Sequence, residues 1–433
     1  MMIKVISLLT CFFAFSISIV FAENVWVIHA GSVLVTPGER PLSNQTIVVR
    51  DNIIERIEKG YITATDVDNG AKLIELKDQF VLPGLMDMHV HLLDELSMTS
   101  RTDLLYVTTS MQALTGAHFA NKTLMAGFTT VRDLGGNPEA IYALRDAVSK
   151  GLIPGPRIFA AGSALAATGG HGDVDGVKPK LLKLWTPETI CDGPYECRKA
   201  TRNAIKMGAN WIKITATGGV LSDTATGTNQ QMTDDELTEI VRTAHSLGVK
   251  VAAHAHGNNG VIAALKAGVD SIDHGTFSDA EAMKLFKQTG AFLVPTLSPG
   301  VKIPATMEGN PFFTDAIKTK SYAASAAAKQ TFFNAYKAGV KIAFGTDSSV
   351  TPHGENADEF VMMVDAGMSA TDAIRSATIT SAELLGVLDK LGTLENGKLA
   401  DIIAVSNNPL KDISTLKKVN FVMKEGKVIK PAP

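Results

Sequence analysis

Cysteine is scarce in this chain, which has three cysteines among 433 residues. One of them, Cys11, lies in the first segment, so Cys191 and Cys197 are the pair left for the folded protein. They are six residues apart, across the turn-forming sequence DGPYE. Two cysteines alone are too few for a structural zinc site. A disulfide and a pair of free thiols both stay open, and a disulfide would fit an oxidising compartment.

A stripe of basic residues is also missing. The chain has 41 lysine and arginine residues against 44 acidic residues, a formal net charge of −3. Without a basic stripe to meet phosphates, a nucleic-acid partner is not expected. Disorder is not indicated either, because 45% hydrophobic and 20% charged residues describe a globular protein. The chain is long enough for a full barrel and a smaller domain.

The first 22 residues, MMIKVISLLTCFFAFSISIVFA, have the pattern of an export signal. A basic start at Lys4 is followed by an apolar stretch, and Val20 and Ala22 precede a suitable cleavage site. We expect a mature chain that begins near Glu23 and is periplasmic or secreted, without stable membrane insertion. A membrane anchor is the alternative, although the apolar stretch is slightly short of a comfortable span. A lipoprotein signal at Cys11 is disfavoured, because the apolar run continues past it.

Both ends of the mature chain contain short runs typical of β-strands. Such runs are VWVIHAGSVLV, QTIVVRDNIIERI and KLIELKDQFVLPG near the start, and KLADIIAVSNNP and VNFVMKEGKVIK at the end. We therefore expect residues 23–82 and 390–433 to pair into one small β-sandwich domain that brings the two ends together. Residues 83–389 would form the body of the protein.

One unit recurs through this body: a helical segment ends at a glycine C-cap, and an apolar strand begins two or three residues later. The units are AGFTTVRD, MGANWIKI, LGVKVAAH, AGVDSIDH, TGAFLVPT and AGVKIAFG. Two further strands, in LPGLMDMHVH and PGPRIFAAG, follow Pro-Gly turns. Eight strands alternating with helical stretches predict an α/β fold, the (β/α)8 or TIM barrel. In one such stretch, Thr233 and Glu236 have the spacing of a capping box.

Side chains able to bind metals stand at the C-terminal ends of these strands, where barrels of this kind carry their chemistry. They are His89, His91, Lys213, His254, His274 and Asp347. Because side chains alternate along a strand, His89 and His91 point to the same side and can bind one metal ion together. An HxH pair alone is a weak signal, but this pair ends an apolar strand within PGLMDMHVH.

With this motif, the chain resembles the amidohydrolase superfamily over essentially its whole length. The motifs IKITATGGV, VAAHAHG, GTDSSVTPHGENA and FVMKEGKVIK are most similar to its binuclear-metal, prolidase-like group. That group contains Xaa-Pro dipeptidases, carboxypeptidases acting on C-terminal Lys or Arg, and amidohydrolases that degrade ochratoxin. The resemblance implies two divalent metal ions, usually zinc, and a homo-oligomer as large as an octamer.

The resemblance also implies which residues hold the metals. His89, His91 and Asp347 would bind one ion, and His254 and His274 the other. Two such ions hold a hydroxide at neutral pH and polarise a carbonyl, so the expected reaction is hydrolysis by a metal-bridging hydroxide. Asp347 would take a proton from the attacking water and deliver it to the leaving nitrogen. The alternative for Asp347 is a turn residue, since Thr-Asp-Ser is turn-like.

Lys213 is the expected bridge between the two metals, after carboxylation by carbon dioxide. It follows Trp211 and Ile212 in a strand that should be buried, where an unpaired ammonium is costly. A carbamate at this position would be an anion able to bridge two cations. An ordinary lysine paired with an acid is the alternative.

Four further residues are candidates for substrate contact. His256 lies two residues beyond His254, further toward the barrel mouth, with a structural role as the alternative. His171, in the glycine-rich ATGGHGD, and His353, in TPHGEN, follow barrel strands. Arg132 in TTVRD could meet a substrate carboxylate or form an ion pair in the barrel core with Asp133 or another acid.

Substrates of the group are dipeptides or N-acyl amino acids with a free carboxylate. The segment VPTLSPGVKIPATMEGNPFF offers Leu297, Phe312, Phe313 and few acids, so a cationic side chain would find little to pair with. We expect proline or an apolar or aromatic residue as the leaving amino acid, including ochratoxin-like amides. The alternatives are hydrolysis of cyclic amides or lactones, deamination on the same barrel, and a non-catalytic metal-binding protein. A deaminase typically needs one metal and no bridging lysine, and a non-catalytic site would tend to be closed by protein ligands.

Overall fold

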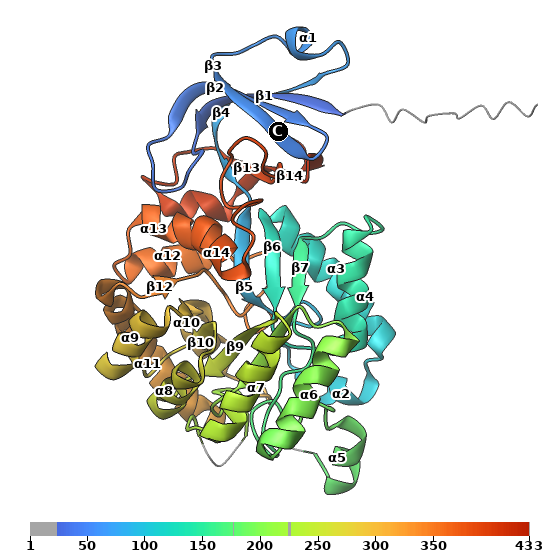
Figure 1. Cartoon of the computed structure of the whole chain (residues 1–433), viewed down its shortest axis with the longest axis vertical. Helices are drawn as coiled ribbons and strands as arrows, with labels where there is room; N and C mark the ends of the chain where they lie inside the picture. The colour runs from blue at the N-terminus through green and yellow to red at the C-terminus, as the bar shows by residue number, and fades with distance from the viewer. Residues whose placement is uncertain (1–23, 176, 224–226, 433) are drawn as a thin grey trace, which may run out of the picture.

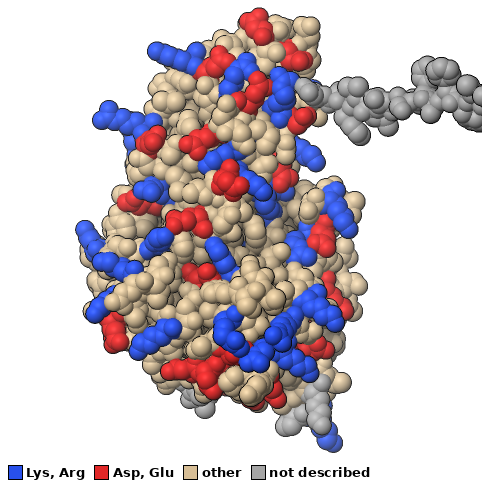
Figure 2. All heavy atoms as spheres, viewed as in Figure 1, with Lys and Arg blue, Asp and Glu red and all other residues tan. Residues whose placement is uncertain are grey.

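The structure is a computed structural model that describes residues 24–175, 177–223 and 227–432. The predicted export signal, residues 1–22, lies outside the described residues. Figure 1 shows a small β-domain above a larger body, in which helices surround strands. Within the described ranges, no helix combines the length and the apolar character that crossing a bilayer requires. On the face shown in Figure 2, acidic and basic side chains are both spread over the surface.

The eight predicted strands of the body form the barrel. They are β5 (Leu85–Val90), β6 (Phe128–Asp133), β7 (Arg157–Ala160), β8 (Trp211–Thr215), β9 (Lys250–Ala255), β10 (Ser271–His274), β11 (Phe292–Val294) and β12 (Lys341–Ile342). Pairing is parallel from β5 to β7 and from β8 to β12. Two further parallel bridges close the ring, between Leu165 and Ile214 and between Val90 and Ser348. The prediction of a (β/α)8 barrel is therefore confirmed.

The helices pack mainly around the barrel. They are α1 (Ala64–Val67), α2 (Ser100–Tyr106), α3 (Thr109–Met125), α4 (Pro138–Ser149), α5 (Pro179–Trp185), α6 (Gly193–Met207), α7 (Asp234–Ser246), α8 (Asn258–Ala267), α9 (Ala280–Thr289), α10 (Leu297–Thr306), α11 (Asp315–Ala338), α12 (Asp358–Asp365), α13 (Ala370–Arg375) and α14 (Ser381–Leu385), with a π-helical turn at Ser376–Thr380 and a 3₁₀ turn at Ile413–Lys417. The predicted capping box of Thr233 and Glu236 is present at the start of α7. The predicted C-caps Gly208 and Gly339 have φ angles of +119° and +76°, which glycine adopts without a steric penalty.

The β-domain is built from both ends of the described chain. Its strands are β1 (Val25–Val33), β2 (Leu42–Arg50), β3 (Ile53–Lys59), β4 (Lys72–Pro83), β13 (Ile402–Val405), β14 (Val419–Lys424) and β15 (Lys427–Lys430). They form one seven-stranded sheet in the order β15-β14-β13-β4-β1-β2-β3. The sheet curls around a single apolar core, so that Ile28 and Ile47 pack in the same cluster as Ile402 and Phe421. This is the β-sandwich that accompanies the barrel.

The connection between the two parts orients the barrel. β4 of the β-domain continues through Gly84 into β5, so the first barrel strand runs away from the β-domain. A side chain at Gly84 would not fit, because its Cβ would lie 2.3 Å from Thr129 Oγ1. In Figure 1 the arrowheads of β6 and β7 also point away from the β-domain. The C-terminal ends of the strands, and with them the mouth of the barrel, therefore face away from the β-domain.

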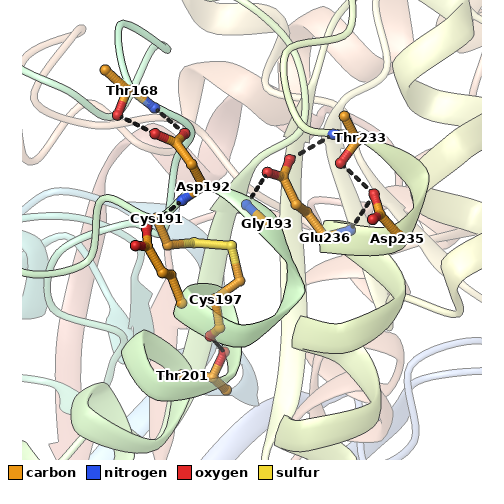
Figure 3. Close-up of a disulfide and its surroundings, with 10 residues drawn as sticks. Thr168, Cys191, Asp192, Gly193, Cys197, Thr201, Thr233, Asp235 and Glu236 are labelled. Carbon is orange, nitrogen blue, oxygen red and sulfur yellow. Dashed lines mark hydrogen bonds between the residues drawn. A yellow bond between two sulfur atoms is a disulfide. The ribbon is translucent and has the colours of Figure 1, made fainter.

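Cys191 and Cys197 form a disulfide, with their Cα atoms 5.0 Å apart. The structure therefore contains the disulfide and not the pair of free thiols that the sequence also allowed. Figure 3 shows that the bond connects the first turn of α6 to the residues just before it. The backbone N–H of Cys191 donates to the oxygen of Ala166 at 3.0 Å. Asp192 accepts hydrogen bonds from the backbone N–H (3.1 Å) and hydroxyl (2.7 Å) of Thr168. The disulfide thus lies where the loop after β7 is tied to α6.

Candidate active site

The structure brings the candidate metal ligands together at the mouth of the barrel. All of them line one cavity of about 480 Å³. They are His89, His91, Lys213, His254, His274 and Asp347. His89, His254 and His274 lie at or near the C-terminal ends of β5, β9 and β10, and His91 directly follows β5. Lys213 lies in the middle of β8, and Asp347 lies in the segment after β12. The alternation of side chains along a strand explains why residues so far apart in sequence face one space.

The first group of ligand atoms forms a small triangle. The Nε2 atoms of His89 and His91 are 3.3 Å apart, and Asp347 Oδ1 lies 3.4 Å and 3.3 Å from them, respectively. Ligands at 2.0–2.1 Å from a tetrahedral zinc ion would be about 3.3 Å apart, so this triangle fits a metal ion. The hydrogen bond from His91 Nδ1 to the oxygen of Gly135 (3.3 Å) leaves Nε2 of that ring free to bind.

The electrostatics of this triangle also indicate a cation. Burial lowers the pKa of His91, but the hydrogen bond and charge of Asp347 outweigh it and raise the pKa to about 9. Burial, together with nearby Lys213 and His91, lowers the pKa of His89 well below its ordinary value. Without a metal, one proton on His91 therefore supplies the positive charge beside the carboxylate. A divalent ion would take the place of that proton.

The second group contains imidazoles from β9, from the residue directly after it and from β10. Ligand atoms of His254, His256 and His274 all lie within 4.8 Å of one another. Burial, and then the neighbouring imidazoles, lower the pKa values of His254 and His274 well below their ordinary range, so both rings are neutral. The Nε2 atom of His254 is buried and has no hydrogen-bond partner among the described residues. His274 directs Nδ1 to Thr296 Oγ1 at 2.7 Å, which leaves its Nε2 free. These donors fit a second metal ion.

Lys213 lines the same cavity as both groups and is almost fully buried, and its charge lowers the pKa of His89 in the first group and of His254 in the second. Its Nζ is 3.2 Å from Asp273 Oδ2, so the pairing with an acid that the sequence left open is present. That acid is shared, because Arg132 Nη2 lies 3.0 Å from the other oxygen of Asp273. Burial lowers the pKa of Lys213, although Asp273 opposes the change. A lowered pKa favours the neutral amine, which is the form that reacts with carbon dioxide.

The predicted substrate contact of Arg132 is corrected by the structure. Arg132 is completely buried and does not line the cavity. Its Nε donates to the oxygen of Met88 at 2.7 Å, and its guanidinium lies over the ring of Trp211 at 4.6 Å. Together with the ion pair to Asp273, these contacts make it a core residue. The ion-pair alternative is therefore correct, although the partner is Asp273 and not Asp133.

The same correction applies to His353. Its side chain is buried outside the cavity lining, where Nε2 donates to the backbone oxygen of Asp94 at 2.9 Å. Its ring is stacked on Phe119 with 4.5 Å between the ring centres. His353 thus connects the loop after β12 to the loop after β5. Its position after the last strand could not reveal that the ring turns away from the mouth.

His171 and His256 do line the cavity, next to the candidate ligands. The ring of His171 lies 4.3 Å from that of His254, and its backbone N–H donates to Gln231 Oε1 at 2.8 Å. His256 Nδ1 is 2.8 Å from Thr276 Oγ1. Burial is the main cause that lowers the pKa of His171 to about 4 and that of His256 to about 3. Both rings are therefore neutral at pH 7 and can exchange hydrogen bonds with a substrate.

Much of the remaining cavity wall is apolar. It includes Leu93, Leu134, Val220, Leu221, Ile303 and Val350. Leu297, Phe312 and Phe313, which the sequence offered for this wall, do not line the cavity, and Phe313 packs behind Ile303. One polar residue that the sequence did not single out, Asp94, does line it. Its position three residues after His91, at the end of a barrel strand, is the signal that could have found it.

Comparison with known proteins agrees with this geometry. Residues 80–429 match the model of the amidohydrolase family. Ochratoxinase from Aspergillus niger is 33% identical over 439 residues, covering 94% of this chain and 87% of the relative. The crystal structure of a Xaa-Pro dipeptidase with bound methionine is similar with a TM-score of 0.90 and 44% identity, covering 94% of this chain and 100% of the other. A prolidase complexed with N-methylphosphonate-L-proline has a TM-score of 0.85 and 29% identity, covering 94% and 100%.

Proposed function

Because the chain belongs to the amidohydrolase family and is a hydrolase of amide bonds, we propose that it cleaves dipeptides or N-acyl amino acids with a free carboxylate. The observation that carries the proposal is the cavity itself, in which the Asp347 carboxylate and the imidazoles meet apolar walls. Its volume of about 480 Å³ suits a small molecule. The similarity to a Xaa-Pro dipeptidase and to ochratoxinase supports proline or an aromatic residue as the leaving amino acid.

Two divalent ions, which we propose to be zinc, would be held by the two groups of donors described above. His89, His91 and Asp347 would bind the first, and His254 and His274 the second. When bound, such ions polarise a carbonyl and lower the pKa of a coordinated water to about 7. A carboxylated Lys213 would supply the anion between them, and the lowered pKa of its amine supports that modification.

Residues of the chain would transfer the proton, orient the substrate and bind its side chain. Asp347 stands at the edge of the cavity, beside His89 and His91, where its carboxylate can accept a proton and return it to the leaving nitrogen. The neutral rings of His171 and His256 would orient the substrate by hydrogen bonds. The apolar wall would receive the side chain of the leaving amino acid and exclude water from it.

The test is amino-acid release from Xaa-Pro, Xaa-Phe, Xaa-Leu and Xaa-Arg dipeptides and from N-acyl-phenylalanines, with ammonia assayed in parallel. We expect release from the proline or apolar members, and loss of that release in a Lys213→Ala variant. Lys341→Ala is the matched control, because Lys341 begins β12 at the opposite end of the barrel. Release of ammonia without an amino acid would identify a deaminase instead. No turnover of any amide would overturn the proposal.

Export and assembly complete the proposal. We propose that the mature protein is periplasmic or secreted, which the disulfide supports because such bonds persist in oxidising compartments.

We also propose a homo-oligomer, as large as an octamer. Exposed apolar side chains on and beside α2 and α3, namely Met98, Tyr106, Met111 and Leu114, support an association surface. Light scattering of the purified protein and N-terminal sequencing of the exported form test these points.

A further inference from the structure

Two carboxylates, Asp347 and Asp94, line the cavity among the described residues. Asp347 belongs to the candidate metal site, where both neighbouring imidazoles face it. Asp94 lies on the loop after β5 and has no such neighbour. Asp94 is exposed, and the apolar residues Leu93 and Val350 line the same cavity. None of the proposed catalytic steps uses the carboxylate of Asp94.

Asp94 is held in place by the loop that follows β12. Ser349, which also lines the cavity, donates its hydroxyl to Asp94 Oδ1 at 2.6 Å. The backbone oxygen of Asp94 accepts from His353 Nε2 at 2.9 Å, and the N–H of Leu96 donates to the oxygen of Ser349 at 2.8 Å. Ser349 has a φ of +110°, which is unusual for a residue with a side chain. The carboxylate is therefore held through one oxygen, and the backbone beside it through two further hydrogen bonds, by a loop in which Ser349 has a strained conformation.

One oxygen of this carboxylate stays available. Ser349 occupies Oδ1, and no donor among the described residues contacts Oδ2. Among the residues that the structure describes, the cavity lining contains no arginine, and its one lysine is Lys213, which pairs with Asp273. Within the described residues, the wall therefore offers Asp94 no cationic partner. A positive group on a bound molecule would meet an anion that a hydrogen bond from Ser349 holds and that no cation of the cavity wall among the described residues neutralises.

We propose that Asp94 recognises a positively charged nitrogen group of the substrate and thereby selects charged substrates over neutral ones. The inference rests on the proposed amide hydrolysis and narrows its substrate class. An ammonium or guanidinium satisfies the chemistry, and it can come from the free α-amino group of a dipeptide or from a Lys or Arg side chain. Asp94 also repels the substrate's carboxylate, which directs that group to the opposite side of the cavity.

The experiment compares matched substrates on the full-length mature enzyme. Ala-Pro and its N-acetyl derivative differ in the charge of the α-amino group, and N-acetyl-Ala-Arg and N-acetyl-Ala-Leu differ in the charge of the side chain. The test variant is Asp94→Asn, which keeps an acceptor for Ser349. Asp103→Asn on α2 is the control, because it removes the same charge from a half-buried residue that does not line the cavity.

We expect Asp94→Asn to lower kcat/KM about tenfold for the charged member of at least one pair and less than twofold for its neutral partner. If the α-amino group is the source, kcat/KM of wild type for Ala-Pro also falls above about pH 8, where that group loses its proton, and the variant loses this dependence. An equal loss for charged and neutral members, or no loss for either, overturns the proposal. If the wild-type enzyme cleaves no member of any pair, the proposed function is wrong, and the proposed role of Asp94, which rests on it, is wrong as well. Wild-type cleavage with unchanged selectivity in the variant overturns only the role of Asp94.

Discussion

The two ends of the barrel differ in whether their charged and imidazole side chains have hydrogen-bond partners within the described chain. At the end next to the β-domain, Arg157 of β7 donates to Thr130 Oγ1 (2.7 Å), Asp401 Oδ2 (3.1 Å) and Glu425 Oε1 (2.5 Å). Asp401 Oδ1 in turn accepts from the backbone N–H of Glu425 at 2.9 Å. Charges there are paired within the chain, and the pairs join β7 to the β-domain.

At the mouth, several polar atoms have no partner in the described chain. The Nδ1 atoms of His89 and His171 and Nε2 of His254 are buried without a hydrogen bond. Left-handed backbone conformations also gather there, in residues other than glycine. They are found at His274, Thr296, Asp347 and Ser349. Such strain and unpaired groups are costly, and they persist where a site needs them. From this contrast we infer that the end next to the β-domain stabilises the fold and that the mouth binds ligands.

The largest effect should come from the mouth. Asp347→Asn keeps the size of the side chain but removes the proton acceptor, so kcat for amide hydrolysis should fall about 10²–10⁴-fold. Steady-state kinetics on the best substrate of the panel, with circular dichroism to verify folding, measure this. Asp401→Asn, at the other end of the barrel, is the control and should keep kcat per folded molecule. If kcat fell by a comparable factor in both variants, the claim that only the mouth of the barrel takes part in catalysis would be wrong.

At the opposite end the loss should be one of stability. Arg157→Met leaves the buried carboxylate of Asp401 without its cation, so the unfolding free energy should fall by about 3–5 kcal/mol. Urea denaturation followed by fluorescence measures this. Activity of the folded fraction should stay unchanged, since Arg157 does not line the cavity. A variant as stable as wild type would show that the junction does not depend on this pair.

A buried carboxylate near the mouth, with no cation paired to it among the described residues, should give the protein a pH-dependent stability. Glu359 accepts hydrogen bonds from the N–H groups of Leu297 and Ser298, but burial outweighs them and raises its pKa from 4.5 to about 7. The folded state therefore holds a proton that the unfolded state loses. Its contribution is fully present below pH 4.5 and is lost as the pH rises through 7, for a total of about 3 kcal/mol.

Urea denaturation across pH 4.5–8 tests this prediction for Glu359. Wild type should lose stability over the interval, and Glu359→Gln should show a flatter profile because its amide does not titrate. Glu355→Gln is a suitable control, since that carboxylate is exposed and pairs with Lys302. Identical slopes for wild type and Glu359→Gln would mean that Glu359 is ionised throughout.

The smallest effect should come from the disulfide. It closes a short loop, so replacing Cys191 and Cys197 by alanine should lower the unfolding free energy by about 2 kcal/mol. Because the bond lies where the loop carrying His171 is tied to α6, KM should rise more than kcat falls. Urea denaturation and steady-state kinetics of the double variant measure both effects. Stability equal to that of wild type would show that the bond adds nothing to the fold.

Much of this arrangement follows from sequence patterns. Glycine before a short apolar run marked most of the barrel strands, and strand ends located the six candidate ligands, because a parallel barrel gathers its strand ends on one face. Side-chain direction could not be predicted from such patterns. His353 turns away from the mouth to bond the loop after β5, Arg132 is drawn into the core by Asp273, and Asp94 belongs to no motif. Two cysteines could likewise not reveal whether they bond.

Metal analysis of the purified mature protein tests the central claim, that the mouth is a two-metal hydrolytic site. Inductively coupled plasma mass spectrometry should find two divalent ions per chain in active wild-type protein and a lower content in Lys213→Ala, with hydrolysis lost in parallel. Lys341→Ala should match wild type in both respects. Fully active wild-type protein with less than one metal ion per chain, or a Lys213→Ala variant that keeps both ions and full activity, would contradict the account.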